Sequence, residues 1–162
     1  MIKLLRVDDR LIHGQVAVVW TSFLQVDTIL VGNDKAANDA FTTMALNLAK
    51  PPGVALHILT LEKVMEFCGN EANKNKKIFI VVGNTNDALV LSKEIEEIND
   101  IVLGGIRKSG EKRLIDRQVF LDEQDLQNCR EMENLGKKVK ITVIPSERSL
   151  SLSEAESIWS KK

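Results

Sequence analysis

Apolar residues in this chain fall into short runs that alternate with longer segments of helical spacing. The short runs are rich in β-branched residues, which favours buried strands. Six such runs are predicted to be strands: Ile2–Val7, Thr28–Val31, Ala55–Leu59, Lys77–Val82, Ile101–Leu103 and Val139–Ile144. A further strand is expected at Arg117–Leu121.

The segments between these runs repeat apolar side chains at intervals of three and four residues, as amphipathic helices do. Asn38 and Asp122 precede two of the segments and are expected to be N-caps. Helices are expected to end at Pro51–Gly53 and at Gly136. Two clear examples of the spacing are Val16, Val19 and Phe23, and Leu126, Cys129 and Met132.

Strands and helices that alternate along a chain form a mostly parallel sheet with helices on both faces. We therefore expect an α/β fold, a three-layer α/β/α arrangement around a central, mostly parallel sheet of six to seven strands. No repeat or linker divides residues 1–162, which are expected to form a single domain. The tail, residues 146–162, is either a short helix, since Ser153 and Glu156 have capping-box spacing, or frayed.

Composition and charge narrow the function classes. The chain has 22 basic and 23 acidic residues, so there is no electrostatic reason to expect binding to nucleic acid. No apolar run approaches the ~20 residues that span a bilayer, and we expect a cytoplasmic protein. Cys68 and Cys129 lack CxxC spacing and are expected to be buried, reduced thiols.

Sites in open parallel sheets form beyond the carboxyl ends of the strands. The segment DDRLIHGQ follows the first predicted strand and is the only such loop with a nucleophile beside charged partners. A helix that begins near Gly14 or Gln15 leaves unpaired N–H groups facing this loop, which favours an anion. Arg10 can donate forked hydrogen bonds to phosphate oxygens, and His13 can act as a covalent nucleophile.

These features predict a histidine that is phosphorylated and a loop that cradles the phosphoryl group. Asp8 or Asp9 could orient Arg10, or could hold one ring nitrogen of His13 and fix its tautomer. The same residues also fit a solvated turn with an ordinary polar histidine, so their spacing alone leaves both interpretations open.

A longer set of segments resembles one protein family. DDRLIHGQV resembles the phosphorylation-site segment of the IIB components in the mannose/sorbose family of the bacterial sugar phosphotransferase system. The resemblance continues in order through VGNDKAANDAF, KPPGVALHILTLEKV, KKIFIVVGNTNDAL, IVLGGIRKSGEKRLIDRQVFLDEQDL and VKITVIPSE. It covers roughly nine-tenths of the chain, which is far more specific than one short motif.

The resemblance implies a phosphotransferase that carries a phosphohistidine. His13 would accept a phosphoryl group from a IIA protein and pass it to a sugar brought in by the membrane IIC and IID subunits. Arg10 would assist at the reacting group, and Gly14, Gln15 and Asp9 would form the phosphate site. The family needs no metal or organic cofactor. Its IIB components are cytoplasmic, and peripheral to the inner face of the membrane when engaged with IIC and IID.

Two stretches depart from the family pattern. The family usually has a methionine after its glycine pair, where this chain has Ile106 and then Arg107. The usual Pro-Gly-Asp ending of the last strand is replaced by Pro145-Ser146-Glu147. These differences concern the rim of the site and its docking surface, and leave the acceptor histidine unchanged.

A non-catalytic receiver-like or regulatory α/β domain is the alternative, because an acidic pair also ends the first strand of receiver domains. That class requires an aspartate at the end of the third strand and a lysine at the end of the fifth. This chain has Thr60 and Gly104-Gly105 at those places. A nucleotide-binding domain would need a GxGxxG or GxxxxGK[ST] loop, and DDRLIHG is neither.

Other polar residues have modest expected roles. His57 is expected to be structural, Trp20 to pack in the core, and Asp34 either to shape the rim or to cap a helix. The sugar, the phosphorylated ring nitrogen and any homo-oligomer are left open by the sequence. Four basic residues follow the glycine pair: Arg107, Lys108, Lys112 and Arg113. This basic patch either contacts phosphate or an acidic partner, or is simply solvated.

Overall fold

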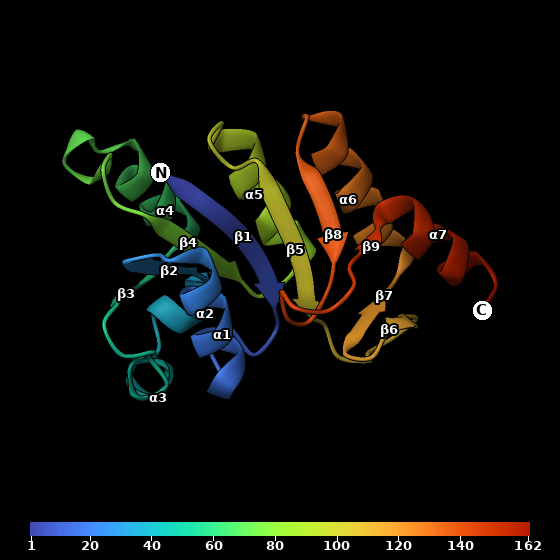
Figure 1. The fold of residues 1–162 in the computed structure, drawn as a ribbon, viewed down its shortest axis with the longest axis horizontal. Helices are drawn as coiled ribbons and strands as arrows, with labels where there is room; N and C mark the ends of the chain where they lie inside the picture. Colours follow the sequence, from blue (N-terminus) through green and yellow to red (C-terminus); the bar gives the residue numbers. More distant parts are fainter.

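The computed structural model describes residues 1–162 and confirms the α/β fold, with a sheet between two layers of helices (Figure 1). Beside the sheet lies a separate antiparallel hairpin of β6 (Arg113–Asp116) and β7 (Val119–Leu121). The sheet strands are β1 (Ile2–Asp8), β2 (Thr28–Gly32), β3 (Ala55–Leu59), β4 (Ile78–Val82), β5 (Asp100–Gly105), β8 (Lys138–Ile141) and β9 (Leu150–Ser151). Their order is β3-β2-β4-β1-β5-β8-β9, and only β9 runs antiparallel to its neighbour.

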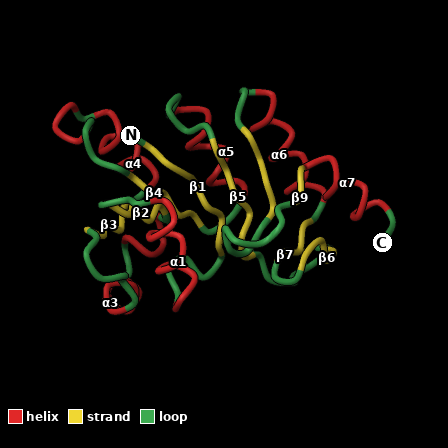
Figure 2. The backbone as a smooth tube through the Cα atoms, viewed as in Figure 1, coloured by secondary structure: helices red, strands yellow, loops and turns green.

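Helices alternate with these strands along the backbone (Figure 2). No helix is both long and apolar enough to cross a membrane. One face of the sheet packs against α1 (Gly14–Leu24), α2 (Asp34–Ala37) and α3 (Ala40–Leu48). The other face packs against α4 (Leu61–Gly69), α5 (Thr85–Glu94), α6 (Glu123–Asn134) and α7 (Leu152–Ser160), with a 3-10 turn at Glu71–Asn73.

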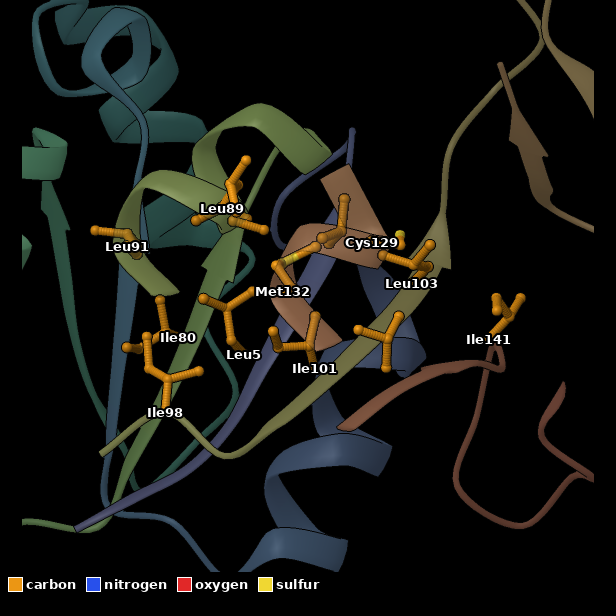
Figure 3. Close-up of a cluster of buried hydrophobic side chains, with 14 of the residues drawn as sticks. Leu5, Ile80, Leu89, Leu91, Ile98, Ile101, Leu103, Cys129, Met132 and Ile141 are labelled. Atoms are coloured by element: carbon orange, nitrogen blue, oxygen red, sulfur yellow. The ribbon is translucent and has the colours of Figure 1, made fainter. Parts of the chain in front are cut away.

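Alternation along the strands sends side chains into two separate cores. On β1, Leu5 and Val7 belong to the larger core under α4 to α7, whereas Leu4 belongs to the smaller core under α1 to α3. Figure 3 shows the larger core, in which Leu89 and Leu91 of α5 and residues of α6 meet the strands. Burial on both faces explains why the central strands are continuous apolar runs.

All six predicted sheet strands are present, but the last one is shorter than expected. β8 ends at Ile141 instead of Ile144. The carbonyl of Val143 accepts hydrogen bonds from Arg6 Nη2 at 3.2 Å and from the Trp20 indole N–H at 2.9 Å. These side-chain donors replace a strand partner. The additional strand expected at 117–121 is β7, and it begins two residues later than predicted.

Helix caps confirm two predictions and correct one. Asp122 caps α6 and accepts the N–H of Asp125 at 2.8 Å, and Gly136 lies just beyond the end of that helix with a φ of 90°. The prediction that Asn38 is an N-cap is wrong. Asn38 ends α2, and the next residue, Asp39, caps α3. Asparagine and aspartate are equally good N-caps, so composition does not separate the two positions.

The tail, residues 146–162, is folded, and its helix begins earlier than the sequence predicts. A capping box joins Ser151 and Glu154, and not Ser153 and Glu156 as the sequence predicts. Both pairs have the required spacing, but Ser151 follows directly from β9 and takes the extended backbone of an N-cap.

Trp159 fixes α7 to the β6–β7 hairpin. Its indole N–H donates to the carbonyl of Leu121 at 2.9 Å. The Arg113 guanidinium lies 3.8 Å from the centre of the Trp159 ring and donates to the Trp159 carbonyl at 3.1 Å. Arg113 therefore holds the tail by a cation–π contact and a hydrogen bond.

A buried ion pair lies on the α1 side of the sheet. Arg6 is only 3% exposed, and its guanidinium pairs with Asp8 on the same strand. Burial lowers the pKa of the Arg6 guanidinium from its usual value, and the charge and hydrogen bond of Asp8 oppose this shift. A charge at this depth needs such partners, because removing it from water is costly.

The glycine pair at the end of β5 makes room for this ion pair. A Cβ at Gly104 would collide with the Arg6 guanidinium, and a Cβ at Gly105 would lie 2.9 Å from Oδ1 of Asp8. The pair is therefore a packing requirement of two charged side chains on the neighbouring strand.

We expect Gly104→Ala to lower the free energy of unfolding by about 1–3 kcal/mol, because its methyl group overpacks the Arg6 guanidinium. Urea denaturation measures the change. Gly69→Ala is the matched control, since a Cβ there meets nothing within 4 Å. A Gly104→Ala protein as stable as the control would contradict the packing argument.

We expect Trp159→Phe to lower the free energy of unfolding by about 1 kcal/mol, through loss of the hydrogen bond to Leu121. Trp159→Ala should cost about 2–3 kcal/mol, because the ring contact with Arg113 is lost as well. Thermal and urea unfolding test both values. Equal losses in the two variants would show that the ring itself contributes nothing to docking of the tail.

Candidate active site

The loop after β1, residues 9–13, lies at the carboxyl edge of the sheet, where the sequence predicts the site. Within it, the N–H of Leu11 donates to the carbonyl of Asp8 at 2.9 Å. Leu11 and Gly14 have positive φ angles of 61° and 46°. Left-handed backbone suits glycine and is costly for leucine, so the tertiary structure must hold this turn. The turn brings His13 back to Asp8.

Asp8 organises this site from a position that is only 1% exposed. Its Oδ2 lies 2.9 Å from Nε2 of His13 and also accepts a hydrogen bond from Arg6. Its Oδ1 accepts the backbone N–H of Arg10 at 2.9 Å. Because Nε2 donates to the carboxylate, Nδ1 of His13 keeps its lone pair and is the ring nitrogen free to act as a nucleophile. The His13 side chain is 28% exposed.

The N-terminus of α1 is open beside this histidine. The helix begins at Gly14, as predicted, and the side chain of its N-cap, His13, makes no capping hydrogen bond. Its first turn carries no acidic residue. The first N–H groups of a helix lack partners within the helix and attract anions. A Cβ at Gly14 would meet nothing within 4 Å, so this backbone is accessible to an anion.

A pocket of about 160 Å³ lies next to His13. Its walls come from the loop after β1, from the segment after β5 and from the β6–β7 hairpin. Its charged lining residues are Arg10, Arg107, Lys108 and Arg117, together with Asp8 and Asp9. This excess of cations favours an anionic group on the histidine.

The cations of the pocket are held in different ways. Asp9 accepts the backbone N–H of Arg107 at 2.8 Å and its Nε–H at 3.2 Å. Lys108 donates to two backbone carbonyls of its own loop, at 3.0 and 2.8 Å. Arg117 pairs with Glu147, with 2.9 Å between Nη1 and Oε1. The guanidiniums of Arg107 and Arg117 are thus each paired with a carboxylate at the rim of the pocket.

The structure brings the predicted site residues together. His13, Arg10 and Asp9 line one pocket, and Gly14 and Gln15 open α1 beside it. The side chain of Arg10 is exposed, while its backbone is bonded to Asp8. The carboxylate of Asp9 pairs with Arg107, so Asp9 would act on a bound anion by positioning that guanidinium.

Three other residues considered from the sequence lie outside this pocket. Lys112, part of the expected basic patch, has its Nζ 2.5 Å from Asp125 at the start of α6. The ring of His57 packs against Phe67 with 5.1 Å between centres, as a structural histidine does. Asp34 accepts the N–H of the first residue of α4 at 2.9 Å, which is the capping alternative.

Arg117 lines the pocket, and Arg6 and Glu147 contact residues that line it, although the loop motif predicts none of the three. Arg6 has a sequence signal, since it interrupts the apolar run of a strand that is otherwise buried. Arg117 has none, because it reaches the pocket from a segment far along the chain. Glu147, which pairs with Arg117, is marked in the sequence only as part of the departure from the family pattern after the last strand.

Neither cysteine competes with His13 as a nucleophile. Both are free, and burial raises the pKa of the Cys129 thiol to about 12 and that of the Cys68 thiol to about 11. Both thiols are therefore neutral at physiological pH, whereas the thiolate is the reactive form.

The chain is similar to known proteins over nearly its whole length. The family model of the PTS system sorbose subfamily IIB component matches residues 2–160. The sorbose-specific EIIB component of Klebsiella pneumoniae is 33% identical over 151 residues, covering 93% of this chain and 92% of that protein. The mannose-specific EIIAB component of Escherichia coli strain K12 is 28% identical over 152 residues, 94% of this chain and 47% of that protein.

A solved structure shows the same arrangement of strands and helices. The crystal structure of the IIBSor domain of the sorbose permease from Klebsiella pneumoniae matches with a TM-score of 0.92 and 32% identity, over 97% of each chain. Sequence and fold therefore agree over nearly the whole chain. The chain belongs to the sorbose-subfamily IIB components of the phosphotransferase system, which are phosphotransferases of sugar transport.

Proposed function

We propose that His13 is the phosphoryl acceptor of this IIB component and that it passes the phosphoryl group to a sugar. The observation that carries the proposal is the 2.9 Å contact between His13 Nε2 and Asp8. This contact lies beside an open helix N-terminus and a pocket lined by cations. It supports Nδ1 as the atom that is phosphorylated, since Nε2 is occupied by the carboxylate.

The proposed transfer moves one phosphoryl group in two steps. The lone pair of His13 Nδ1 attacks the phosphorus of a phosphohistidine on the donor protein. The new N–P bond forms as the donor's N–P bond breaks, and that electron pair returns to the donor imidazole. The phosphorylated ring keeps its proton on Nε2, where Asp8 balances the positive charge. A sugar hydroxyl then attacks phosphorus, the N–P bond breaks, and the hydroxyl proton passes to water.

Charge stabilisation accounts for the remaining site residues. A phosphoryl group carries close to two negative charges and several strong acceptor oxygens. We assign the backbone N–H groups of Gly14 and Gln15 to these oxygens, because they open α1. The Arg10 guanidinium is exposed at the same pocket and supplies forked hydrogen bonds. Asp9 positions Arg107 at the rim.

A IIA protein is the proposed donor, and membrane IIC and IID subunits are the proposed partners in the second step. One relative is a mannose-specific EIIAB component, of which this chain matches 47%. With a formal net charge of -1, the chain offers no general attraction to nucleic acid. We propose that it works in the cytoplasm, at the inner face of the membrane when it meets IIC and IID.

The first test is the intact mass of the protein after incubation with phosphoenolpyruvate, the general phosphotransferase proteins and a IIA protein. We expect the wild type to gain one phosphate that is labile to acid and stable to base, as a phosphohistidine is. His13→Gln should gain none. His57→Gln is the matched control and should behave as the wild type. Phosphate that persists in His13→Gln would contradict the assignment of the site.

A second test identifies the ring nitrogen. Two-dimensional NMR of the phosphorylated, ¹⁵N-labelled protein should show phosphorus coupled to Nδ1 of His13. Asp8→Asn removes the charge beside both Nε2–H of His13 and the Arg6 guanidinium. We expect it to slow phosphorylation by roughly 10- to 100-fold, because the imidazole ring is no longer held in place. Circular dichroism confirms that the variant is folded. Coupling to Nε2 in the wild type would overturn the proposed role of Asp8.

A further inference from the structure

The turn of the β6–β7 hairpin places Arg117 at the pocket beside His13. Backbone hydrogen bonds fix this placement. The N–H of Ile106 donates to the carbonyl of Gln118 at 2.9 Å, and the N–H of Phe120 donates to the carbonyl of Ile106 at 2.9 Å. Ile106 directly follows the glycine pair that packs against the Arg6–Asp8 ion pair. The hairpin is therefore bonded to Ile106, the residue that follows Gly105 in the wall of the pocket.

Arg117 is paired in a way that leaves its guanidinium free to change partners. Nη1 lies 2.9 Å from Oε1 of Glu147, which belongs to the segment after β8. The side chain of Arg117 is 56% exposed and that of Glu147 is 30% exposed. Asp116 is a weaker neighbour, with Oδ1 3.8 Å from Nε of Arg117. Ion pairs as exposed as this one contribute little to stability, so exchanging one carboxylate for a stronger anion is easy.

The other cations of the pocket are already assigned or are bonded to backbone groups. Arg107 is joined to Asp9 through both its backbone N–H and its side chain. Lys108 is bonded to backbone carbonyls, which a phosphoryl group would have to replace. Arg10 is already assigned to the phosphoryl group. Arg117 is therefore the additional cation whose present partners are side chains alone, Glu147 and the more distant Asp116.

We propose that Arg117 is a further phosphoryl-binding catalytic residue, held by Glu147 while His13 is unmodified and bound to the phosphoryl group once His13 is phosphorylated. This inference rests on the proposed function of His13. A phosphoryl group offers more charge and more acceptor oxygens than one carboxylate, and the guanidinium fork matches its geometry. Glu147 competes for the same guanidinium, so it opposes phosphorylation of His13.

The closing experiment measures the pKa of the phosphoryl group itself. Phosphoramidate, a small phosphoryl donor, loads His13, and a ³¹P NMR titration gives the pKa at which the phosphoryl group takes up its proton. A nearby cation favours the more highly charged form and lowers this pKa. We expect Arg117→Met to raise it by about one pH unit. Arg117→Lys, which keeps a charge without the fork, should restore part of the shift.

Glu147 provides the second arm of the experiment. Glu147→Gln removes the competing carboxylate, so we expect a lower phosphoryl pKa than in the wild type. The same substitution should have a smaller effect in the Arg117→Met background, because Glu147 acts mainly through Arg117. Arg148→Met is the matched control, since this exposed arginine pairs with Glu154 in the tail, outside the pocket. It should leave the phosphoryl pKa unchanged.

The outcomes separate this inference from the proposed function. If the wild type is phosphorylated on His13, and neither Arg117→Met nor the Arg148→Met control changes the phosphoryl pKa, the proposed role of Arg117 is wrong. That result leaves the proposed function of His13 intact. A wild type that takes no phosphoryl group on His13, from phosphoramidate or from a IIA protein, overturns the proposed function and this inference with it. A melting temperature of Arg117→Met equal to that of the wild type shows that the hairpin is intact.

Discussion

The ion pair between Arg6 and Asp8 is the interaction on which the rest of the site depends. Arg6 lies too deep to remain without a partner, so Asp8 is placed beneath the loop to pair with it. The same carboxylate orients His13. The neighbouring strand must then end in glycines, and β8 must stop early so that the carbonyl of Val143 can meet Arg6. One buried charge thus sets the loop, the end of the adjacent strand β5 and the end of β8, the strand beyond it.

The layered fold is predictable from the sequence because its signals are local. Central strands are short apolar runs, and the helices carry apolar residues at intervals of three and four. The predictions are wrong about the ends of elements, where a contact from elsewhere in the chain or the local backbone conformation decides which residue is the last or the first. Strand β8 is shortened by donors from β1 and α1, and the cap of α3 depends on which of two suitable neighbours, Asn38 or Asp39, is extended.

The candidate site is only partly local. His13, Arg10 and the start of α1 lie in one stretch of loop, so a single motif indicates them. Arg117, at the turn of the β6–β7 hairpin, reaches the pocket through backbone bonds between Ile106 and the hairpin, which no pattern within one segment reveals. The four basic residues that look alike in sequence consequently divide: Arg107 and Lys108 line the pocket, whereas Lys112 and Arg113 hold structure.

The short antiparallel strand β9 has a consequence for how the sheet meets other chains. It pairs with Lys140 and Ile141, and so covers part of the outer edge of β8. Because β9 is only two residues long, it offers too few unpaired backbone N–H and C=O groups for a strand of another chain to pair with it. The exposed Lys138 and Lys140 on β8 add like charges that discourage stacking of identical copies. This margin of the sheet is thereby protected against edge-to-edge growth into fibrils.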